Sequence, residues 1–366
     1  MNGVSISELG LIYVSDTEPG IRRRRQGRGF CYRLPNGRLL SDPIQKKRIA
    51  ALGLPPAYEN VWICLQENGH LQATGYDARG RKQYRYHKDW QSFRSIEKFD
   101  QLIEFGQALP KMRRTMLRHL EAGPEDVNGV LAALATLLDE AHLRVGSPAY
   151  TRENGTYGAT TLLKRHLKMA DGRIELQFVA KGGKRVRRSL RHPRLQRILE
   201  EIADLPGRQL FVWKDESGTL RLIDSGRLNA YLADISGMAI SAKTFRTWAG
   251  SVAAFSAARD ALAKGTRPTV KEISEAAAAI LHNTPAISRS SYIHPAIIAL
   301  ADKGRQPSED EIKPLLEPLR GLRAEENRLL DFLIRAAGQV EKAPLLVASG
   351  MASPPSAKAK ADLISS

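Results

Sequence analysis

Residues 92–120 read SFRSIEKFDQLIEFGQALPKMRRTMLRHL, and here the spacing of apolar residues changes to that of a helix. Apolar side chains recur three or four positions apart, at Phe93, Ile96, Phe99, Leu102, Ile103 and Phe105, and then at Met112, Met116, Leu117 and Leu120. Such spacing places them on one side of an α-helix. The stretch predicts two amphipathic helices and marks residue 92 as the start of a mainly helical domain.

Upstream of residue 92, short β-prone runs alternate with turn residues. The runs occupy residues 11–14, 30–34, 61–65, 71–74 and 83–86. A Pro-Asn-Gly turn follows the second run, and a glycine ends the fourth. This part of the chain is expected to form a small β-rich domain.

Downstream of residue 120, helical spacing continues. Helices are predicted over residues 127–143, 225–235, 244–263, 270–281 and 308–337. One β segment interrupts them at residues 173–190, where two alternating runs flank Gly182 and Gly183, which is a strong hairpin signal. Lys181 would lie at the hairpin tip, and residues 210–213 could add a third strand.

The fold class predicted from these patterns is α+β. A β-rich N-terminal domain is expected over residues 1–91. A mainly α-helical catalytic domain that contains the hairpin or three-stranded sheet would follow over residues 92–305. Residues 306–366 would form a helical C-terminal extension and a flexible tail, whose last part is rich in Ala, Ser, Pro and Lys.

The composition indicates an anionic partner. The 366 residues contain 56 Lys and Arg against 39 Asp and Glu, a formal net charge of +17. Nucleic acid ranks above a membrane surface, because no basic amphipathic anchor and no long apolar run is present. The two cysteines exclude a disulfide framework and a four-cysteine zinc site, which favours a reducing, cytoplasmic compartment.

The residues that carry chemistry gather in residues 281–295, LHNTPAISRSSYIHP. No GxxxxGK[ST] phosphate loop, HExxH metal motif or GxSxG serine motif occurs. The segment resembles the active-site tyrosine segment of type IB DNA topoisomerases, in the compact form found in poxviruses and bacteria. The motifs PPAYENVW at 55–62 and GYDARGRKQY at 75–84 extend the resemblance, which covers about residues 11–300.

The resemblance implies a role for each of five residues. Tyr292 would be the nucleophile, Arg144 and Arg246 would clamp the scissile phosphate, Lys181 would be the general acid, and Asn283 would donate to a phosphate oxygen. A tyrosine oxygen can hold a phosphodiester, and guanidiniums present fixed donors where charge develops. A lysine at a hairpin tip can protonate the departing 5′ oxygen.

Two of these assignments have competitors. The poxvirus enzymes carry histidine where this chain has Asn283, and His282 stands one position earlier. An amide donates without carrying charge, so the role would become independent of pH. For the general acid, the alternatives to Lys181 are Lys164, Lys184 and Arg185.

The resemblance also implies DNA contacts in the N-terminal domain, at Arg81, Gln83, Tyr84 and Tyr86. Arg and Gln suit base edges, and tyrosines contact phosphates or pack on sugars. For Tyr86, an ordinary exposed sheet residue is an equal alternative. The run Arg22 to Arg25 is expected to follow phosphates without sequence preference, and residues 55–58 to fix a turn.

The predicted function is therefore that of a type IB DNA topoisomerase, an ATP-independent isomerase that uses a 3′-phosphotyrosyl intermediate. It would relax positive and negative supercoils with no cofactor or metal. The predicted partner is double-stranded DNA, held by a two-domain clamp; the protein would be a monomer with no membrane contact, located with the nucleoid in the cytoplasm. A tyrosine recombinase and a DNA-binding protein without activity are the alternatives. Phe245-Arg246-Thr247-Trp248 lacks the recombinase His-x-x-Arg pattern.

Overall fold

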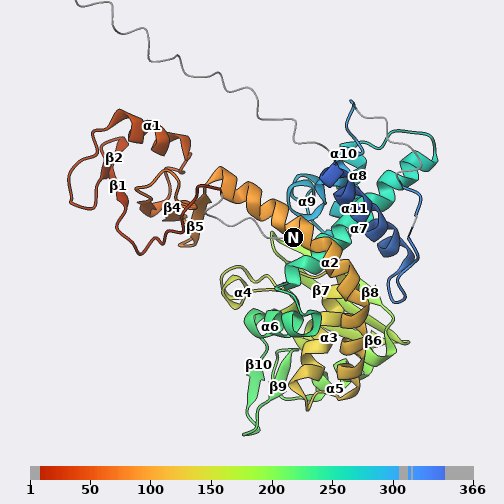
Figure 1. The fold of residues 1–366 in the computed structure, drawn as a ribbon. Helices are drawn as coiled ribbons and strands as arrows, with labels where there is room; N and C mark the ends of the chain where they lie inside the picture. Colours follow the sequence, from red (N-terminus) through yellow and green to blue (C-terminus); the bar gives the residue numbers. More distant parts are fainter. Residues whose placement is uncertain (1–8, 305–311, 315, 343–366) are drawn as a thin grey trace, which may run out of the picture. The chain divides into compact units, whose positions relative to one another are not determined.

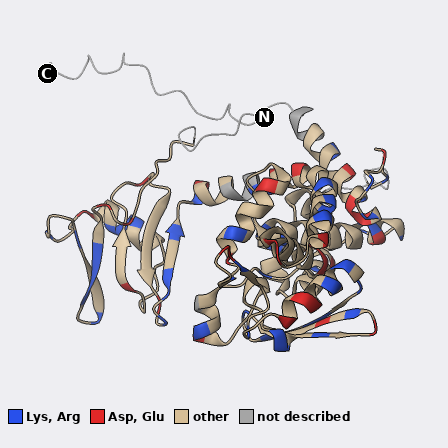
Figure 2. Cartoon of the chain, turned by 90° about the horizontal axis from the view of Figure 1, so that it is seen from below, with Lys and Arg blue, Asp and Glu red and all other residues tan. Residues whose placement is uncertain are grey.

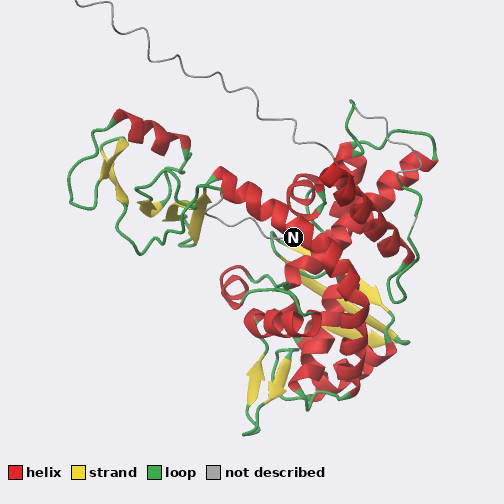
Figure 3. Cartoon of the chain, viewed as in Figure 1, coloured by secondary structure: helices red, strands yellow, loops and turns green. Residues whose placement is uncertain are grey.

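The computed structural model describes residues 9–304, 312–314 and 316–342, and the chain forms two compact units, Met1–Asp100 and Gln101–Ser366 (Figure 1). The first unit contains an antiparallel sheet, whereas the second is mainly helical with two small sheets (Figure 3). The predicted α+β class is confirmed. Lys and Arg are distributed over both units (Figure 2). No helix in the described ranges is long and apolar enough to cross a membrane.

The N-terminal unit is built on a five-stranded sheet with the order β2-β1-β3-β4-β5. Its elements are β1 (Ile21–Gln26), β2 (Gly29–Arg33), α1 (Pro43–Ala51), β3 (Glu59–Ile63), β4 (Leu71–Tyr76) and β5 (Lys82–Tyr86). Ile21, Ile49, Val61 and Ile63 are buried in its core. Four of the five expected β runs coincide with β2, β3, β4 and β5 and are confirmed. The first, residues 11–14, forms only an isolated bridge at Ile12, and β1 and α1 were not predicted. At the edge of the sheet, β5 pairs on one side only, with β4.

One of the four consecutive arginines has a structural role. The Arg23 side chain is buried and donates to the backbone carbonyls of Leu54, Pro55 and Tyr58 at 3.3, 2.9 and 2.6 Å. Its guanidinium also lies 4.2 Å from the centroid of the Phe30 ring. The expectation that all four arginines follow DNA phosphates is wrong for Arg23. The turn expected here is confirmed, because the Tyr58 amide donates to the Pro55 carbonyl at 3.1 Å.

A single helix, α2 (Lys88–Glu121), replaces the two helices predicted for this stretch. It contains Pro110, which cannot donate a backbone hydrogen bond and normally disfavours a helix interior by about 3 kcal/mol. The buried residues Leu109, Met112 and Met116 continue the apolar stripe across the proline. Burial of this stripe outweighs the local preference. The helix also runs across residues 91 and 92, where the domain boundary was expected.

The remaining helices belong to the second unit. They are α3 (Val127–Ala141), α4 (Pro148–Asn154), α5 (Pro193–Asp204), α6 (Ser225–Ser236), α7 (Ala242–Ala263), α8 (Val270–Leu281), α9 (Pro285–Tyr292), α10 (Pro295–Ala299) and α11 (Ala324–Lys342). Two 3₁₀ turns, Ala159–Thr161 and Lys164–His166, precede the sheet. Almost every side chain of α3 is buried, which makes it the central helix, and α7 packs against α8 and α9.

The predicted hairpin is present, but its third strand is not the one expected. Strands β7 (Arg173–Ala180) and β8 (Lys184–Leu190) form the hairpin, and β6 (Leu167–Ala170) completes the sheet beside β7. The expected third strand, residues 210–213, overlaps β9 (Val212–Lys214), which pairs instead with β10 (Leu220–Leu222). A tight turn from Asp215 to Gly218 brings β10 back at once, and such a short loop costs little entropy to close.

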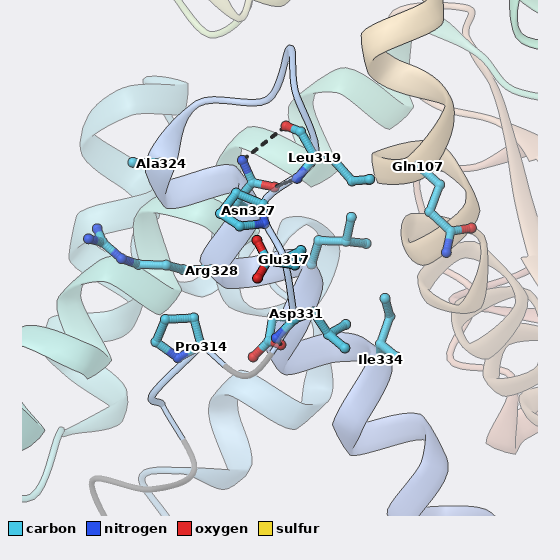
Figure 4. A pocket seen from close by; sticks show the side chains of 12 residues that line it. Gln107, Pro314, Glu317, Leu319, Ala324, Asn327, Arg328, Asp331 and Ile334 are labelled. Atoms are coloured by element: carbon cyan, nitrogen blue, oxygen red, sulfur yellow. Dashed lines mark hydrogen bonds between the residues drawn. The ribbon is translucent and has the colours of Figure 1, made fainter.

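The C-terminal helix starts later than predicted, at residue 324 instead of 308. Residues 308–311 and 315 of the predicted helix lie outside the described residues. Pro314 and Pro318 disfavour a helix before α11. Side chains of α11 hold the preceding segment: Asn327 Oδ1 accepts from the Leu319 amide at 2.7 Å and Asp331 Oδ1 from the Leu316 amide at 2.9 Å. The Asn327 amide also donates to the Leu319 carbonyl at 3.3 Å (Figure 4). The cavity beside them measures about 410 Å³.

A buried ion cluster joins α11 to two earlier helices. Arg113 of α2 contacts Asp139 of α3 and Glu326 of α11, each at 2.8 Å. Burial alone would raise the pKa of Glu326, but hydrogen bonds from Arg113 and its charge outweigh this and lower the pKa. The C-terminal helix is therefore an integral part of the second unit.

Candidate active site

The ends of two helices, α3 and α8, carry two of the predicted site residues. Each helix stops at a histidine in the left-handed conformation, His142 with φ 53° and His282 with φ 49°. Arg144 follows the first helix closely, and Asn283 directly follows the second. Since a left-handed residue redirects the chain at a helix end, these caps determine where both side chains start.

Arg246 joins the two helix ends. Its side chain, on α7, is 4% exposed and donates to the carbonyls of His142 and Leu281, the latter at 2.9 Å. Carbonyls at helix C-termini have no partner within the helix and attract cations. Its Nε is also buried and makes no hydrogen bond within the described part of the chain. One N–H of this guanidinium thus remains available for an anion.

Arg144 and Asn283 are in direct contact. A terminal nitrogen of Arg144 donates to Oδ1 of Asn283, although the two residues are 139 positions apart in the sequence. The amide nitrogen of Asn283 is buried and has no partner in the described ranges. A second unused N–H donor therefore lies beside Arg144.

Tyr292 is the last residue of α9 and is half-buried. The Arg246 guanidinium lies 5.1 Å from the centroid of its ring, and the Lys243 ammonium lies 5.9 Å from it. Two residues of α7 fix the backbone beside the ring. Ser251 Oγ accepts from the His294 amide at 3.0 Å and donates to the Tyr292 carbonyl at 3.4 Å. Next to it, a Cβ on Gly250 would lie 2.6 Å from the Tyr292 carbonyl oxygen.

The electrostatics of this cluster favour an anion. Among the residues described, no carboxylate pairs with Arg144, Arg188 or Arg246, and all three line one small hollow of about 10 Å³. Burial lowers the pKa of Arg144. Burial also lowers the pKa of Arg246, and with the smaller effect of the Arg144 charge it reaches about 10. Both guanidiniums therefore stay protonated at neutral pH. Burial and neighbouring cations also lower the pKa of His282, which keeps its imidazole neutral.

Lys181 is not part of this cluster. It is exposed at the hairpin tip, where Gly182 and Gly183 have φ of 80° and 73°, and its ammonium lies 5.2 Å from the centroid of the Tyr150 ring. Among its competitors, Lys164 donates one of its three N–H groups to the Leu205 carbonyl. The described contacts thus join Tyr292, Arg144, Arg246 and Asn283, and none of these contacts includes Lys181.

In the N-terminal unit, the predicted DNA contacts surround the edge strand. Asp77 binds Arg81 at 2.6 Å and Gln83 at 3.0 Å, and Arg81 holds the pKa of this carboxyl down at about 2. Tyr84 and Tyr86 are exposed, with their rings stacked at 6.1 Å and 9°. Because side chains alternate along a strand, Gln83 and the tyrosines lie on opposite faces of β5.

Three residues of the cluster were not predicted: Arg188, Gly250 and Ser251. For Arg188 a signal existed, because alternation along β8 puts it on the same face as the apolar Val186 and Leu190. For Gly250 and Ser251 the sequence carries no such signal, since both matter only through their approach to Tyr292.

Two family descriptions match the chain. Eukaryotic DNA topoisomerase I, catalytic core, matches residues 87–308, and bacterial DNA topoisomerase IB, N-terminal domain, matches residues 29–77. The DNA topoisomerase 1B of Acanthamoeba polyphaga mimivirus is 30% identical over 285 residues, which cover 75% of this chain and 85% of that protein. The DNA topoisomerase 1B of vaccinia virus (strain Copenhagen) is 25% identical over 124 residues, which cover 34% of this chain and 39% of that protein.

Proposed function

The chain belongs to the type IB DNA topoisomerase family, which its sequence motifs resemble. From this membership we propose how the protein acts on DNA. The proposed reaction relaxes supercoiled duplex DNA by cleaving one strand, letting it rotate about the other and resealing it. The match of residues 29–77 to a topoisomerase domain argues against the recombinase alternative.

In the cleavage step, the Tyr292 oxygen attacks the scissile phosphorus. A bond from phosphorus to this oxygen forms and the bond to the 5′ oxygen breaks, which leaves a 3′-phosphotyrosyl link and a free 5′ hydroxyl. The phenolic proton leaves to solvent, and Lys181 gives a proton to the 5′ oxygen. Religation is the same step in reverse, so the energy of the phosphodiester bond is retained.

The observation that carries this proposal is the pair of buried, unused donors beside Tyr292. Nε of Arg246 and Nδ2 of Asn283 have no acceptor in the described structure, and a buried donor without an acceptor costs about 1–3 kcal/mol. Oxygens of a bound phosphate would satisfy both, together with Arg144. These donors would stabilise the charge that develops on the phosphate in the transition state.

The proposed general acid, Lys181, lies on the hairpin and is not among the described residues that contact Tyr292. Lys181 is exposed at a tip formed by two glycines, and its long stem carries a single charged group. We propose that bound DNA, and not the protein alone, completes the arrangement by bringing the 5′ oxygen to Lys181.

The proposed reaction uses neither ATP nor a metal ion. Guanidiniums supply the positive charge at the phosphate, and tension in the supercoiled DNA drives the net change. Because rotation about the intact strand has no preferred direction, positive and negative supercoils would both relax. One chain supplies all five groups, which supports action as a monomer, and the bacterial N-terminal domain supports a place at the nucleoid in the cytoplasm.

The edge strand β5 is proposed to read the duplex. Asp77 holds Arg81 and Gln83 in place, where they could turn to base edges in the major groove. Tyr84 and Tyr86 would contact phosphates or sugars from the other face of the same strand. An edge strand presents both faces to a groove, so the opposite orientations are compatible with one binding mode.

Trapping a covalent complex tests the proposal. The protein is mixed with a nicked or plasmid duplex in EDTA without ATP and then denatured, and DNA labelled at either end of the cleaved strand reports the polarity of the link. We expect an adduct at the 3′ phosphate, relaxation of both supercoil signs, and no adduct with Tyr292→Phe. Tyr13→Phe, the same change at an exposed tyrosine outside the proposed site, should still form it. An adduct that persists in Tyr292→Phe, or none with the unchanged protein, would refute the assignment.

A further inference from the structure

Arg188 is a half-buried guanidinium that the proposed chemistry does not use. It lies in β8 on the inward face, between Val186 and Leu190 in the alternation. Its Nε donates to the Ala141 carbonyl at 3.1 Å, and a terminal nitrogen donates to the Ile280 carbonyl. Ala141 is the last residue of α3, and Ile280 lies in the last turn of α8. Arg188 therefore bridges the C-termini of two helices.

Arg246 makes a parallel bridge one residue further along both helices. It donates to the carbonyls of His142 and Leu281, next to those that Arg188 binds. Two guanidiniums thus bind two adjacent carbonyls on each helix. The carbonyl ends of two helices carry partial negative charges that repel each other, and the cations between them offset that repulsion.

These two arginine bridges, made by Arg188 and Arg246, determine the positions of two proposed phosphate-binding groups. Arg144 is the third residue after Ala141, and Asn283 is the third after Ile280. Their side chains touch, although they come from different helices. A small shift of α8 relative to α3 would separate them, while each helix itself stayed intact.

We propose that Arg188 is a positioning residue for strand cleavage, an inference that rests on the proposed function. It holds the ends of α3 and α8 together so that Arg144 and Asn283 can bind the same phosphate. It acts through the two helices and not through a contact with DNA. Its planar fork suits this task, because two donors reach two carbonyls in fixed directions, whereas a lysine ammonium is a single compact charge.

The test compares rates of a single round of cleavage on a duplex whose leaving strand dissociates. The variants are Arg188→Met, Arg188→Lys and, as a matched control, Arg187→Met, which removes an exposed arginine from the neighbouring position of the same strand. Misplacing a phosphate-binding pair by about 1 Å is expected to slow Arg188→Met about 100-fold. Arg188→Lys should recover part of this loss. DNA affinity should match that of the control within about threefold.

Two further readouts separate positioning from general damage to the fold. Cleavage and religation share one transition state, so both rates should fall by the same factor and leave the fraction of covalent complex unchanged. In the double variant Arg188→Met with Asn283→Ala, the loss should be smaller than the product of the two single losses, because both changes disable the same pair. All rates are measured below each variant's melting midpoint.

The proposal fails if Arg188→Met cleaves within about threefold of Arg187→Met, or if the two losses multiply independently. A shift in the fraction of covalent complex would also overturn it. These results require a wild-type protein that forms the adduct. Absence of the wild-type adduct would overturn the proposed function itself, so the two failures are distinguishable.

Discussion

At the scale of single residues, Gly250 brings α7 close to the backbone of Tyr292, the proposed nucleophile. An added Cβ would lie 2.6 Å from the Tyr292 carbonyl oxygen and 3.1 Å from its Cβ. We expect Gly250→Ala to slow cleavage about 100-fold by displacing Tyr292. Alanine favours a helix over glycine by about 1 kcal/mol, so the melting temperature need not fall in parallel.

Gly338→Ala is the matched control, since it makes the same change in α11 where the added Cβ would meet nothing within 4 Å. Single-turnover cleavage and thermal melting of both variants are the measurements. Equal cleavage rates for the two variants would show that the close approach at Gly250 does not hold the nucleophile.

A substitution at Asn283 that replaces only its amide nitrogen tests whether this nitrogen donates to the phosphate. Asn283→Asp replaces the buried, unused N–H donor by an oxygen acceptor, and the new carboxylate would pair with Arg144, to which Asn283 already bonds. We expect cleavage at neutral pH to fall by more than about 100-fold and DNA binding to weaken, because the carboxylate repels the phosphate and occupies its clamp.

Asn128→Asp, at the start of α3, changes the net charge equally and serves as the control in the same filter-binding and cleavage assays. Full activity of Asn283→Asp would mean that the amide donates nothing to the phosphate, and the role would then pass to another group.

At the scale of elements, the left-handed cap of α3 links stability to pH. Burial lowers the pKa of His142 to about 4, against an ordinary value of about 6.5 when unfolded. Between these values the unfolded chain binds the proton more readily, so stability is lost as pH falls. From pH 7 to pH 5 the loss at this site is about 2 kcal/mol.

His142→Asn should remove that part of the pH dependence, since asparagine tolerates the left-handed conformation and does not titrate. Urea unfolding at pH 7 and pH 5 measures the difference for both proteins. An equally steep loss in the variant would assign the pH dependence to other groups.

Elements also show how much of the fold the sequence predicts. Helix α8 was predicted at its observed bounds, and the β7–β8 hairpin was predicted from Gly182 and Gly183, because local signals decide both. The two helices expected in α2 and the strand pairing expected for residues 210–213 were wrong. Burial against distant residues determined the single helix, and the choice between two possible partner strands determined the pairing. Neither can be predicted from neighbouring residues in the sequence.

The candidate site shows the same limit. The resemblance supplied Tyr292, Arg144, Arg246 and Asn283, which the structure gathers, and also Lys181, whose described contact is with the Tyr150 ring. Arg188 binds carbonyls at the ends of α3 and α8 that only the fold brings close to β8. The sequence alone could therefore indicate only that this arginine faces inward.

At the scale of the whole molecule, the charge of +17 predicts strongly salt-dependent binding. Residues 343–366, which lie outside the described residues, add Lys358 and Lys360. If both meet phosphates, deleting this segment should reduce the slope of log affinity against log salt by about 2, while the cleavage rate of bound DNA stays the same. Binding titrations between low and moderate salt measure the slope. An unchanged slope would exclude the tail from DNA binding.

The contact between Arg144 and Asn283 spans 139 positions, and that between Arg113 and Glu326 spans 213. Under the proposed mechanism, the order of synthesis therefore controls when the protein becomes able to cut DNA. A nascent chain that already exposes its N-terminal sheet would still lack Tyr292, the proposed nucleophile, and Asn283, a proposed phosphate donor, until the last quarter of the chain has emerged. The proposed mechanism would thereby confine strand breakage to finished molecules, which could also reseal the break.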